Sequence, residues 1–218
     1  MSVEKNKFMS FISNKFVAGC RKIYDFFYYR QCRRRLTNSG FTIIAPNCYA
    51  GIMYHRLGLQ FLSPTINCYF PYRKQYLEFC RRLSDYLSKD IIIAFDERFN
   101  CPVGDLDGIM IVFNHYKSVE EALSAWNKRK QRVNLDKLYI IFDDIDDIEY
   151  DDLVEFNKIS SSGKVIFTAK KYEYIENTVL LSEYASSGKL EHYLMFKNKY
   201  TGKYPSDKDF DFVNWLNS

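Results

Sequence analysis

Polar side chains gather where four apolar stretches of the chain end. They are Asn47, Cys48 and Tyr49; Asn114, His115 and Tyr116; Asp143, Asp144 and Asp146; and Lys170, Lys171 and Tyr172. In open α/β sheets ligands bind beyond the carboxyl ends of the strands, because the loops diverge there and helix N-termini point free N–H groups into the gap. If the four stretches are parallel neighbours, these polar sets converge on one cleft.

The acidic turn from Asp143 to Asp147 is the candidate metal centre. Carboxylate oxygens are ligands that Mg²⁺ and Mn²⁺ prefer, and such a cation neutralises the diphosphate of a nucleotide sugar. In this hypothesis Asp144 and Asp146 hold the cation. The alternative is a solvated helix entry, where first-turn carboxylates interact favourably with the helix dipole. The short Asp-x-Asp pattern is compatible with both interpretations.

Cys48 and His115 suggest a second chemistry. A thiol at a strand-to-helix turn, activated by an imidazole and by the helix start, could carry an acyl group in covalent catalysis. No G-x-S-x-G motif and no family cysteine motif accompanies them in the sequence. The structural alternative is a packed thiol and a hydrogen-bonded histidine, since buried cysteines are ordinary small apolar residues.

The elements that position these side chains are short strands alternating with helices. The predicted strands are Phe41 to Ala45, Thr65 to Phe70, Ile91 to Phe95, Ile109 to Phe113, Leu138 to Phe142 and Val165 to Thr168. Helices are predicted up to Leu57, after Pro71, after the capping-box residue Ser118, from about Asp151, and over the closing residues Phe210 to Leu216. Arg98 to Asp107 is predicted as a loop, because it contains Pro102 and Gly104.

This alternation predicts an α/β fold with a largely parallel, or mixed, sheet flanked by helices in Rossmann-like layering. The chain has 218 residues, of which 47% are hydrophobic, enough for a sizeable core. We therefore expect residues 36–218 to form a single α/β domain, or two tightly packed subdomains, preceded by a helical segment over residues 1–35.

The N-terminal segment combines an apolar stripe with positive charge. Its apolar residues recur at helical spacing: Phe8, Ile12, Phe16, Cys20, Ile23 and Phe27. It carries nine Lys or Arg against Glu4 and Asp25, a charge of +7, which leaves the remainder at −3. One interpretation is peripheral contact of residues 5–35 with a membrane surface; the other is an amphipathic helix packed on the domain. The mildly acidic remainder argues against a dedicated nucleic-acid binder.

Cysteine usage and hydropathy bear on the compartment. The six cysteines are far apart and form no C-x-x-C pair or metal-ligand spacing, as expected of reduced thiols. No run of 18 apolar residues and no signal-peptide pattern is present. We expect a cytoplasmic protein, with a peripheral position at the inner face of the membrane if the N-terminal helix binds lipid.

An ordered series of short motifs resembles a known family from about residue 33 to the C-terminus. The series comprises Phe41-Thr42-Ile43-Ile44, Asn47-Cys48-Tyr49-Ala50-Gly51, Leu57-Gly58-Leu59, Ser63-Pro64-Thr65, His115-Tyr116-Lys117-Ser118, Trp126-Asn127-Lys128-Arg129-Lys130, Lys164-Val165-Ile166-Phe167-Thr168 and Phe210-Asp211-Phe212-Val213. It resembles a bacterial family of unknown function associated with exopolysaccharide and capsule biosynthesis. The resemblance implies a pathway and no particular reaction.

The chain departs from that family pattern at two places. Ala50 stands where the resemblance leads us to expect a glycine of a Gly-Gly pair, which weakens the expectation of close backbone approach to a ligand. Ile145 and Asp147 stand where a basic residue and a glycine are expected. Asp144 and Asp146 match, so the two candidate metal ligands remain while a candidate phosphate-binding cation is lost.

Our leading hypothesis is a transferase in surface-polysaccharide assembly that binds a sugar, a sugar nucleotide or a glycan. His115 serves as base or hydrogen-bond donor and Asp144 positions a cation or sugar hydroxyls. The expected binding residues are Asn47, Tyr49, Gly51, Asn114, Tyr116, Asp146 and Lys170. Two alternatives remain open. One is an acetyl- or other acyltransferase that uses Cys48 and acts on a glycan. The other is a non-catalytic glycan-binding or scaffold subunit, with Tyr49, Tyr54 and Tyr116 as stacking platforms.

Overall fold

Four parallel strands form the central sheet of the protein. The computed structural model describes residues 2–145, 148–191, 193–194, 198 and 201–218, and for residues 2–16 the backbone alone. The sheet order is β1-β5-β6-β7, with β1 (Thr42–Ile44), β5 (Leu138–Asp143), β6 (Gly163–Thr168) and β7 (Thr178–Leu180). All three strand pairs are parallel. The loops after β1, β5 and β6 therefore leave the sheet at the same edge.

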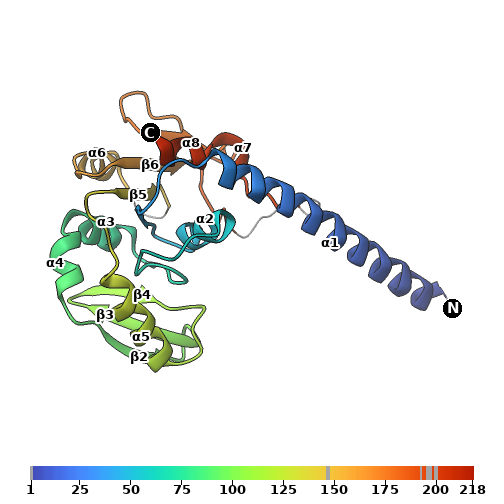
Figure 1. Cartoon of the computed structure of the whole chain (residues 1–218), viewed down its shortest axis with the longest axis horizontal. Coiled ribbons are helices and arrows are strands. Elements are labelled where there is room, and N and C mark those ends of the chain that lie inside the picture. Colours follow the sequence, from blue (N-terminus) through green and yellow to red (C-terminus); the bar gives the residue numbers. More distant parts are fainter. Residues whose placement is uncertain (1, 146–147, 192, 195–197, 199–200) are drawn as a thin grey trace.

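Helices connect and cover the strands (Figure 1). Those of the described chain are α1 (Ser2–Arg35), α2 (Tyr49–Leu57), α3 (Arg73–Arg81), α4 (Leu83–Ser88), α5 (Val119–Lys130), α6 (Tyr150–Asn157), α7 (Ser206–Asp209) and α8 (Phe212–Asn217). The predicted start of α5 is confirmed, because the Ser118 hydroxyl accepts a hydrogen bond from the Glu121 backbone N–H at 3.2 Å. Gly58, with φ of +68°, ends α2 in the left-handed conformation that glycine adopts readily.

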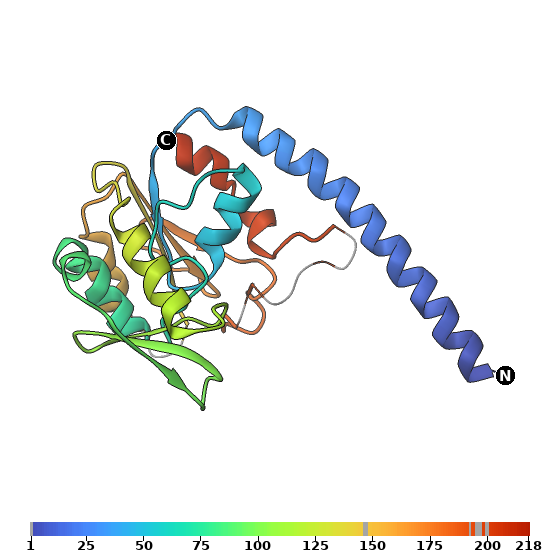
Figure 2. The same ribbon diagram turned by 60° about the horizontal axis from the view of Figure 1, so that its bottom comes forward.

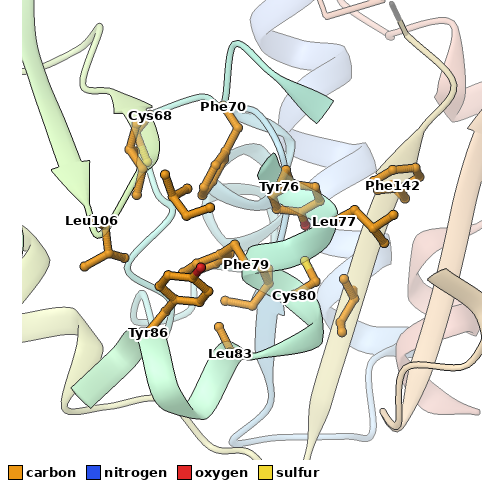
Figure 3. Close-up of a cluster of buried hydrophobic side chains, with 14 of the residues drawn as sticks. Cys68, Phe70, Tyr76, Leu77, Phe79, Cys80, Leu83, Tyr86, Leu106 and Phe142 are labelled. Atoms are coloured by element: carbon orange, nitrogen blue, oxygen red, sulfur yellow. The ribbon is translucent and has the colours of Figure 1, made fainter. Parts of the chain in front are cut away.

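The sheet is buried on both faces, and alternate side chains of β5 show this directly. Leu138, Ile140 and Phe142 belong to an apolar cluster with residues of α3, α4, α5 and α6, part of which Figure 3 shows. Tyr139 and Ile141 belong to a second cluster with residues of α2 and α8. A parallel strand covered by helices on both sides needs apolar residues at every position, as β5 has. The predicted α/β class and its layering are confirmed.

A second, antiparallel sheet contains β2 (Ile92–Asp96), β3 (Cys101–Leu106) and β4 (Ile109–Val112). Two of these strands were predicted, but the predicted loop from Arg98 to Asp107 is wrong, since β3 occupies most of it. The hairpin between β3 and β4 turns at Asp107 and Gly108, with φ of +53° and +86°. Asp-Gly is a residue pair that two-residue hairpin loops favour, so the sequence did contain the signal for this hairpin.

Two further strand predictions need correction. The predicted strand from Thr65 to Phe70 is a turn in its first half, and in the described chain the segment pairs through one isolated bridge between Tyr69 and Val112. Strand β7, in contrast, was not predicted. It has three residues and none of them is fully buried, so it offers too short an apolar pattern to distinguish it from a loop.

Helix α1 confirms the predicted N-terminal helix and extends well beyond the rest of the molecule (Figures 1 and 2). Its C-terminal part packs on the molecule, where Cys32 is buried in the same cluster as α2 and α8. Ile23, Phe26 and Phe27, in contrast, are exposed. Across the residues that the structure describes, no helix combines the length and apolar character needed to cross a membrane.

Candidate functional site

A cavity of about 930 Å³ opens near the carboxyl ends of β1 and β5. Its lining residues come from α1, the loop after β1 with α2, the segment between α2 and α3 with the start of α3, the segments after β4 and β5, and the chain before α7: Arg21, Asp25, Tyr29, Asn47, Cys48, Gly51, Ile52, His55, Phe61, Asn67, Tyr69, Phe70, Pro71, Arg73, Asn114, His115, Ile145, Tyr193, Leu194, Gly202 and Tyr204. Half of the predicted site residues are among them, namely Asn47, Cys48, Gly51, Asn114 and His115. The strand-end rule thus led to residues that do lie together around one cavity.

An ion pair between Arg73 and Asp143 supports the cavity wall. Arg73, at the start of α3, donates to both carboxylate oxygens of Asp143 at the end of β5, and also to the carbonyl of Phe70. The side chains are 8% and 0% exposed. Taking two charges out of water is costly unless further hydrogen bonds satisfy them, so a pair this deeply buried requires polar neighbours.

Asn47 and Tyr193 complete this network. The Asn47 side-chain amide donates to the Tyr193 hydroxyl at 3.0 Å and to Asp143 at 3.3 Å. Its carbonyl oxygen accepts a hydrogen bond from the Tyr49 backbone N–H at 3.0 Å, which fixes the first turn of α2. The Tyr193 hydroxyl donates to Asp143 at 3.4 Å, and burial raises the pKa of Tyr193 well above its usual range. Asn47 therefore links the helix start to the buried carboxylate.

Cys48 and His115 both line the cavity, next to Asn114. Burial raises the pKa of the Cys48 thiol, and the hydrogen bond with Asn114 only partly opposes this shift. An activated cysteine needs a lowered pKa, so the surroundings of Cys48 act in the opposite direction. In the described chain no hydrogen bond joins Cys48 to His115. The nucleophilic role of Cys48 stays a prediction without support from its electrostatic environment.

The tyrosines predicted as binding or stacking residues are buried outside the cavity lining. Tyr49 is fully buried with its ring against Phe167 and Tyr193. The hydroxyl of Tyr54 donates to the carbonyl of Phe41, and that of Tyr116 donates to the carbonyl of Ile66. The aromatic residues among the lining are Tyr29, Phe61, Tyr69, Phe70, Tyr193 and Tyr204.

Asp144 and Lys170 are not among the lining residues either. The Asp144 carboxylate accepts hydrogen bonds from the Ala169 backbone N–H at 3.3 Å and from the Tyr172 hydroxyl at 3.3 Å, which ties the end of β5 to the end of β6. Burial raises the pKa of Asp144 to about 6, although the two hydrogen bonds act to lower it. Lys170 is exposed nearby. Asp144 is thus turned toward the sheet edge and away from Asn47 and His115.

The predicted metal centre cannot be built from the described residues, because its second ligand, Asp146, lies outside them together with Asp147. Within the described ranges no group of three or more His, Cys, Asp or Glu side chains is arranged to hold a metal ion. The pairing of Asp144 with Asp146 around Mg²⁺ or Mn²⁺ therefore stays a prediction.

Several lining residues were not identified from the sequence. Arg73 opens α3 beside a predicted helix start, yet nothing in its spacing indicates that it reaches Asp143, 70 positions away. Arg21, Asp25 and Tyr29 belong to a helix that was interpreted through its apolar stripe. His55 of α2 is exposed and lines the cavity, with its ring against Tyr29. The sequence signal that could have indicated a residue such as Arg73 is Asp143 itself, because a carboxylate at the end of a buried strand requires a cationic partner.

Comparison with known proteins identifies relatives of unknown function. An uncharacterised protein of Haemophilus influenzae is 31% identical over 203 residues, which covers 93% of this chain and 97% of that protein. Residues 20–217 match the family described as a domain of unknown function, DUF1919. These matches agree with the expected family of unknown function and carry no reference to exopolysaccharide or capsule biosynthesis. By this match over most of its length, the chain belongs to the DUF1919 family.

Proposed function

We propose that the protein is a transferase that binds a sugar nucleotide or a phosphorylated glycan in the cavity beside β1 and β5. The observation that carries this proposal is the composition of the lining, in which amide side chains, aromatic rings and cationic side chains surround one space. Amides hydrogen-bond sugar hydroxyls, and aromatic rings offer apolar faces to the sugar ring or the base. A volume of about 930 Å³ is within the range of ligand sites.

The cationic residues of the lining are suited to phosphate groups. Arg21 and Arg73 both carry guanidinium groups, which bind phosphate oxygens through paired N–H donors. Arg73 is oriented by Asp143, and Arg21 lines the cavity from α1. The free N–H groups at the start of α2 favour negative charge in the same region. A diphosphate lying near the start of α2 would meet these groups together.

Asn47, Asn67 and Asn114 would bind the sugar hydroxyls, and His115 would act as base or hydrogen-bond donor toward the acceptor. Asn114 and His115 are exposed at the cavity wall, so a second substrate can reach them from solvent. Participation in surface-polysaccharide assembly is the further part of the proposal, and it depends on the family resemblance of the sequence motifs.

The first test is a thermal-shift screen of the purified protein against nucleotide sugars, each with and without Mn²⁺. A ligand that binds only the folded state raises the free energy of unfolding by mass action, by about 2.7 kcal/mol at a concentration of 100 times its Kd. The melting temperature rises accordingly. We expect a shift with one nucleotide sugar that disappears in Asn114→Ala. The matched control is Asn214→Ala, since Asn214 is also exposed but lies on α8, outside the lining.

Turnover separates a transferase from a binding protein. We expect release of the nucleoside phosphate when a glycan acceptor is added, and a loss of about 10²- to 10⁴-fold in kcat for His115→Ala with unchanged nucleotide-sugar binding. Binding without any turnover would favour the non-catalytic glycan-binding alternative. The absence of a thermal shift with every nucleotide sugar would contradict the proposal.

Acyl transfer is a second candidate, because Cys48 lies in the lining of the same cavity. It predicts a thermal shift with acyl-coenzyme A and no requirement for metal. Cys48→Ser should then retain acyl-coenzyme A binding but form no acyl-enzyme detectable by mass spectrometry. The raised pKa of Cys48 makes this candidate the weaker of the two.

A further inference from the structure

Helix α1 has two faces with different surroundings. One face lies on the rest of the molecule, with Cys32 buried and the rings of Tyr28 and Tyr29 against Arg56. The other face carries Ile23, Phe26 and Phe27, which are 62%, 59% and 65% exposed. Because positions three and four apart are neighbours on a helix, these three side chains form one apolar patch. We call them, with Arg30 and Arg34 further along the same side, the outer face of α1.

Positive charge accompanies the apolar patch of the outer face. Lys22, Arg30 and Arg34 are exposed, and in the described part of the chain none of their side chains forms a hydrogen bond or an ion pair. Asp25 is the acidic residue among the described side chains of α1, and it lies on the other side, where it lines the cavity. The outer face therefore presents apolar rings and uncompensated cations together.

We infer that the outer face of α1 binds an anionic lipid surface. A helix with Phe and Ile on one side and flanking Lys and Arg lies at the boundary between headgroups and acyl chains, where the apolar residues leave water and the cations meet acidic headgroups. The charge complementarity favours lipid over a second copy of the chain, because the described part of the outer face of a second copy would offer Arg30 and Arg34 further cations and no acidic partner. Like charges at such a contact are unfavourable.

The same helix would bring the cavity to the lipid surface. Arg21, Asp25 and Tyr29 line the cavity from the inner side of α1, a helix diameter away from Phe26 and Phe27. A lipid-bound α1 would hold the cavity next to the headgroups. Resting on the proposed function, this placement indicates that the acceptor of the transferase is a lipid-linked glycan.

The test is co-sedimentation of the full chain with vesicles. We expect binding to vesicles of phosphatidylcholine mixed with phosphatidylglycerol, and weak binding to phosphatidylcholine alone. Arg30→Gln combined with Arg34→Gln should weaken binding to the anionic vesicles about 30-fold, since each basic residue near such a surface contributes about one kcal/mol. Phe26→Ser combined with Phe27→Ser should weaken it at least as much.

The matched control is Tyr174→Ser, an aromatic residue that is 84% exposed and lies away from α1. All the substituted residues are exposed, so the melting temperature of each variant should stay that of the natural chain, and nucleotide-sugar binding without vesicles should be unchanged. Equal sedimentation with both vesicle types, or no loss in either double variant, would overturn the inference. A dimer in analytical ultracentrifugation that Phe26→Ser with Phe27→Ser abolishes would overturn it in favour of a second copy.

Discussion

Two buried arginine–aspartate pairs lie near opposite ends of α2, and their surroundings differ. Arg56, in the last turn of α2, forms a bidentate pair with Asp207 of α7, with exposed side-chain fractions of 3% and 0%. Arg73 and Asp143, near the first turn, are buried almost as completely. Arg73 lines the cavity, whereas Arg56 does not. The same chemical pair lies at the cavity wall in one place and outside the cavity lining in the other.

The Arg56 pair serves as a clamp between three parts of the chain. The guanidinium of Arg56 lies 5.3 to 5.9 Å from the ring centroids of Tyr28, Tyr29, Tyr204 and Phe212, which come from α1, α8 and the segment before α7. Burial alone would lower the pKa of Arg56, but the hydrogen bonds and charge of Asp207 raise it overall. The Arg73 pair, in contrast, is surrounded by hydrogen-bonding groups, Asn47 and Tyr193. Aromatic enclosure indicates stability, and polar enclosure beside a cavity indicates recognition.

Breaking the clamp should have the largest effect. Arg56→Met leaves the Asp207 carboxylate buried without its cation, which costs about 3 to 5 kcal/mol of the free energy of unfolding. Urea denaturation measures this loss. The control is Arg98→Met, because Arg98 forms an exposed pair with Asp96 and its removal should leave the unfolding midpoint unchanged. Equal midpoints for the two variants would show that the clamp does not stabilise the fold.

Neutralising one aspartate of each pair sharpens the comparison. Asp143→Asn and Asp207→Asn keep the shape of the side chain and should each cost about 3 kcal/mol, because the arginine stays buried without its counter-ion while the Asn oxygen still accepts one of its hydrogen bonds. Only Asp143→Asn should abolish nucleotide-sugar binding, measured by calorimetry well below the melting temperature, because it releases Arg73 from its orientation. Loss of binding in both variants, or in neither, would remove the functional distinction between the pairs.

Asp144, adjacent to Asp143, should make stability depend on pH. Burial raises its pKa in the folded state to about 6, above the ordinary value of 3.8. The protonated form is therefore favoured by folding, and this stabilisation is complete below pH 3.8 and is lost as pH rises through about 6. Asp144→Asn should raise the free energy of unfolding at pH 7 on the order of 1 to 2 kcal/mol, after allowance for its partial exposure.

The control for this pH dependence is Asp90→Asn, since the Asp90 side chain is fully exposed. Urea denaturation between pH 4 and about 7 should give a flatter stability profile for Asp144→Asn than for Asp90→Asn. Parallel profiles for the two variants would mean that Asp144 titrates at its ordinary value in the folded protein.

The difference between the two pairs also shows what the sequence can and cannot predict. Strands such as β5 and β6 are continuous apolar runs, so local pattern suffices to identify them and the polar residues at their ends. Asn47, Asn114 and His115 were found in this way. The sequence does not show which of two neighbouring carboxylates points toward the cavity, because this depends on side-chain direction at the end of the strand. The prediction therefore placed Asp144 in the site, whereas Asp143 is the residue that pairs with Arg73 of the cavity lining.

Long-range partners are beyond such patterns. Arg73 and Asp143 are 70 positions apart, and Arg56 and Asp207 are 151 apart, so only the folded arrangement reveals which arginine is buried with which aspartate. Strand β3 was missed for a different reason. Pro102 and Gly104 indicated a loop, whereas the Asp107-Gly108 pair indicates a hairpin turn that requires a strand before it. Local turn chemistry was available there, whereas tertiary pairing was not.

Removing one hydroxyl from the Arg73 network should have the smallest effect. Tyr193→Phe keeps the ring against Phe167 and Tyr49 but removes the hydrogen bonds with Asn47 and Asp143. Asn47 and Asp143 still contact each other, so the cost should be about 1 kcal/mol.

The matched control is Tyr184→Phe, because the buried Tyr184 hydroxyl has no hydrogen-bond partner among the described residues, and its removal should be neutral or stabilising. Tyr193→Phe should also weaken nucleotide-sugar binding a few-fold, since Asn47 loses one of the contacts that orient its amide, while Tyr184→Phe should bind normally. If both variants bind and unfold alike, the hydroxyl of Tyr193 contributes nothing to the network, and the polar enclosure that distinguishes Arg73 from Arg56 reduces to Asn47 alone.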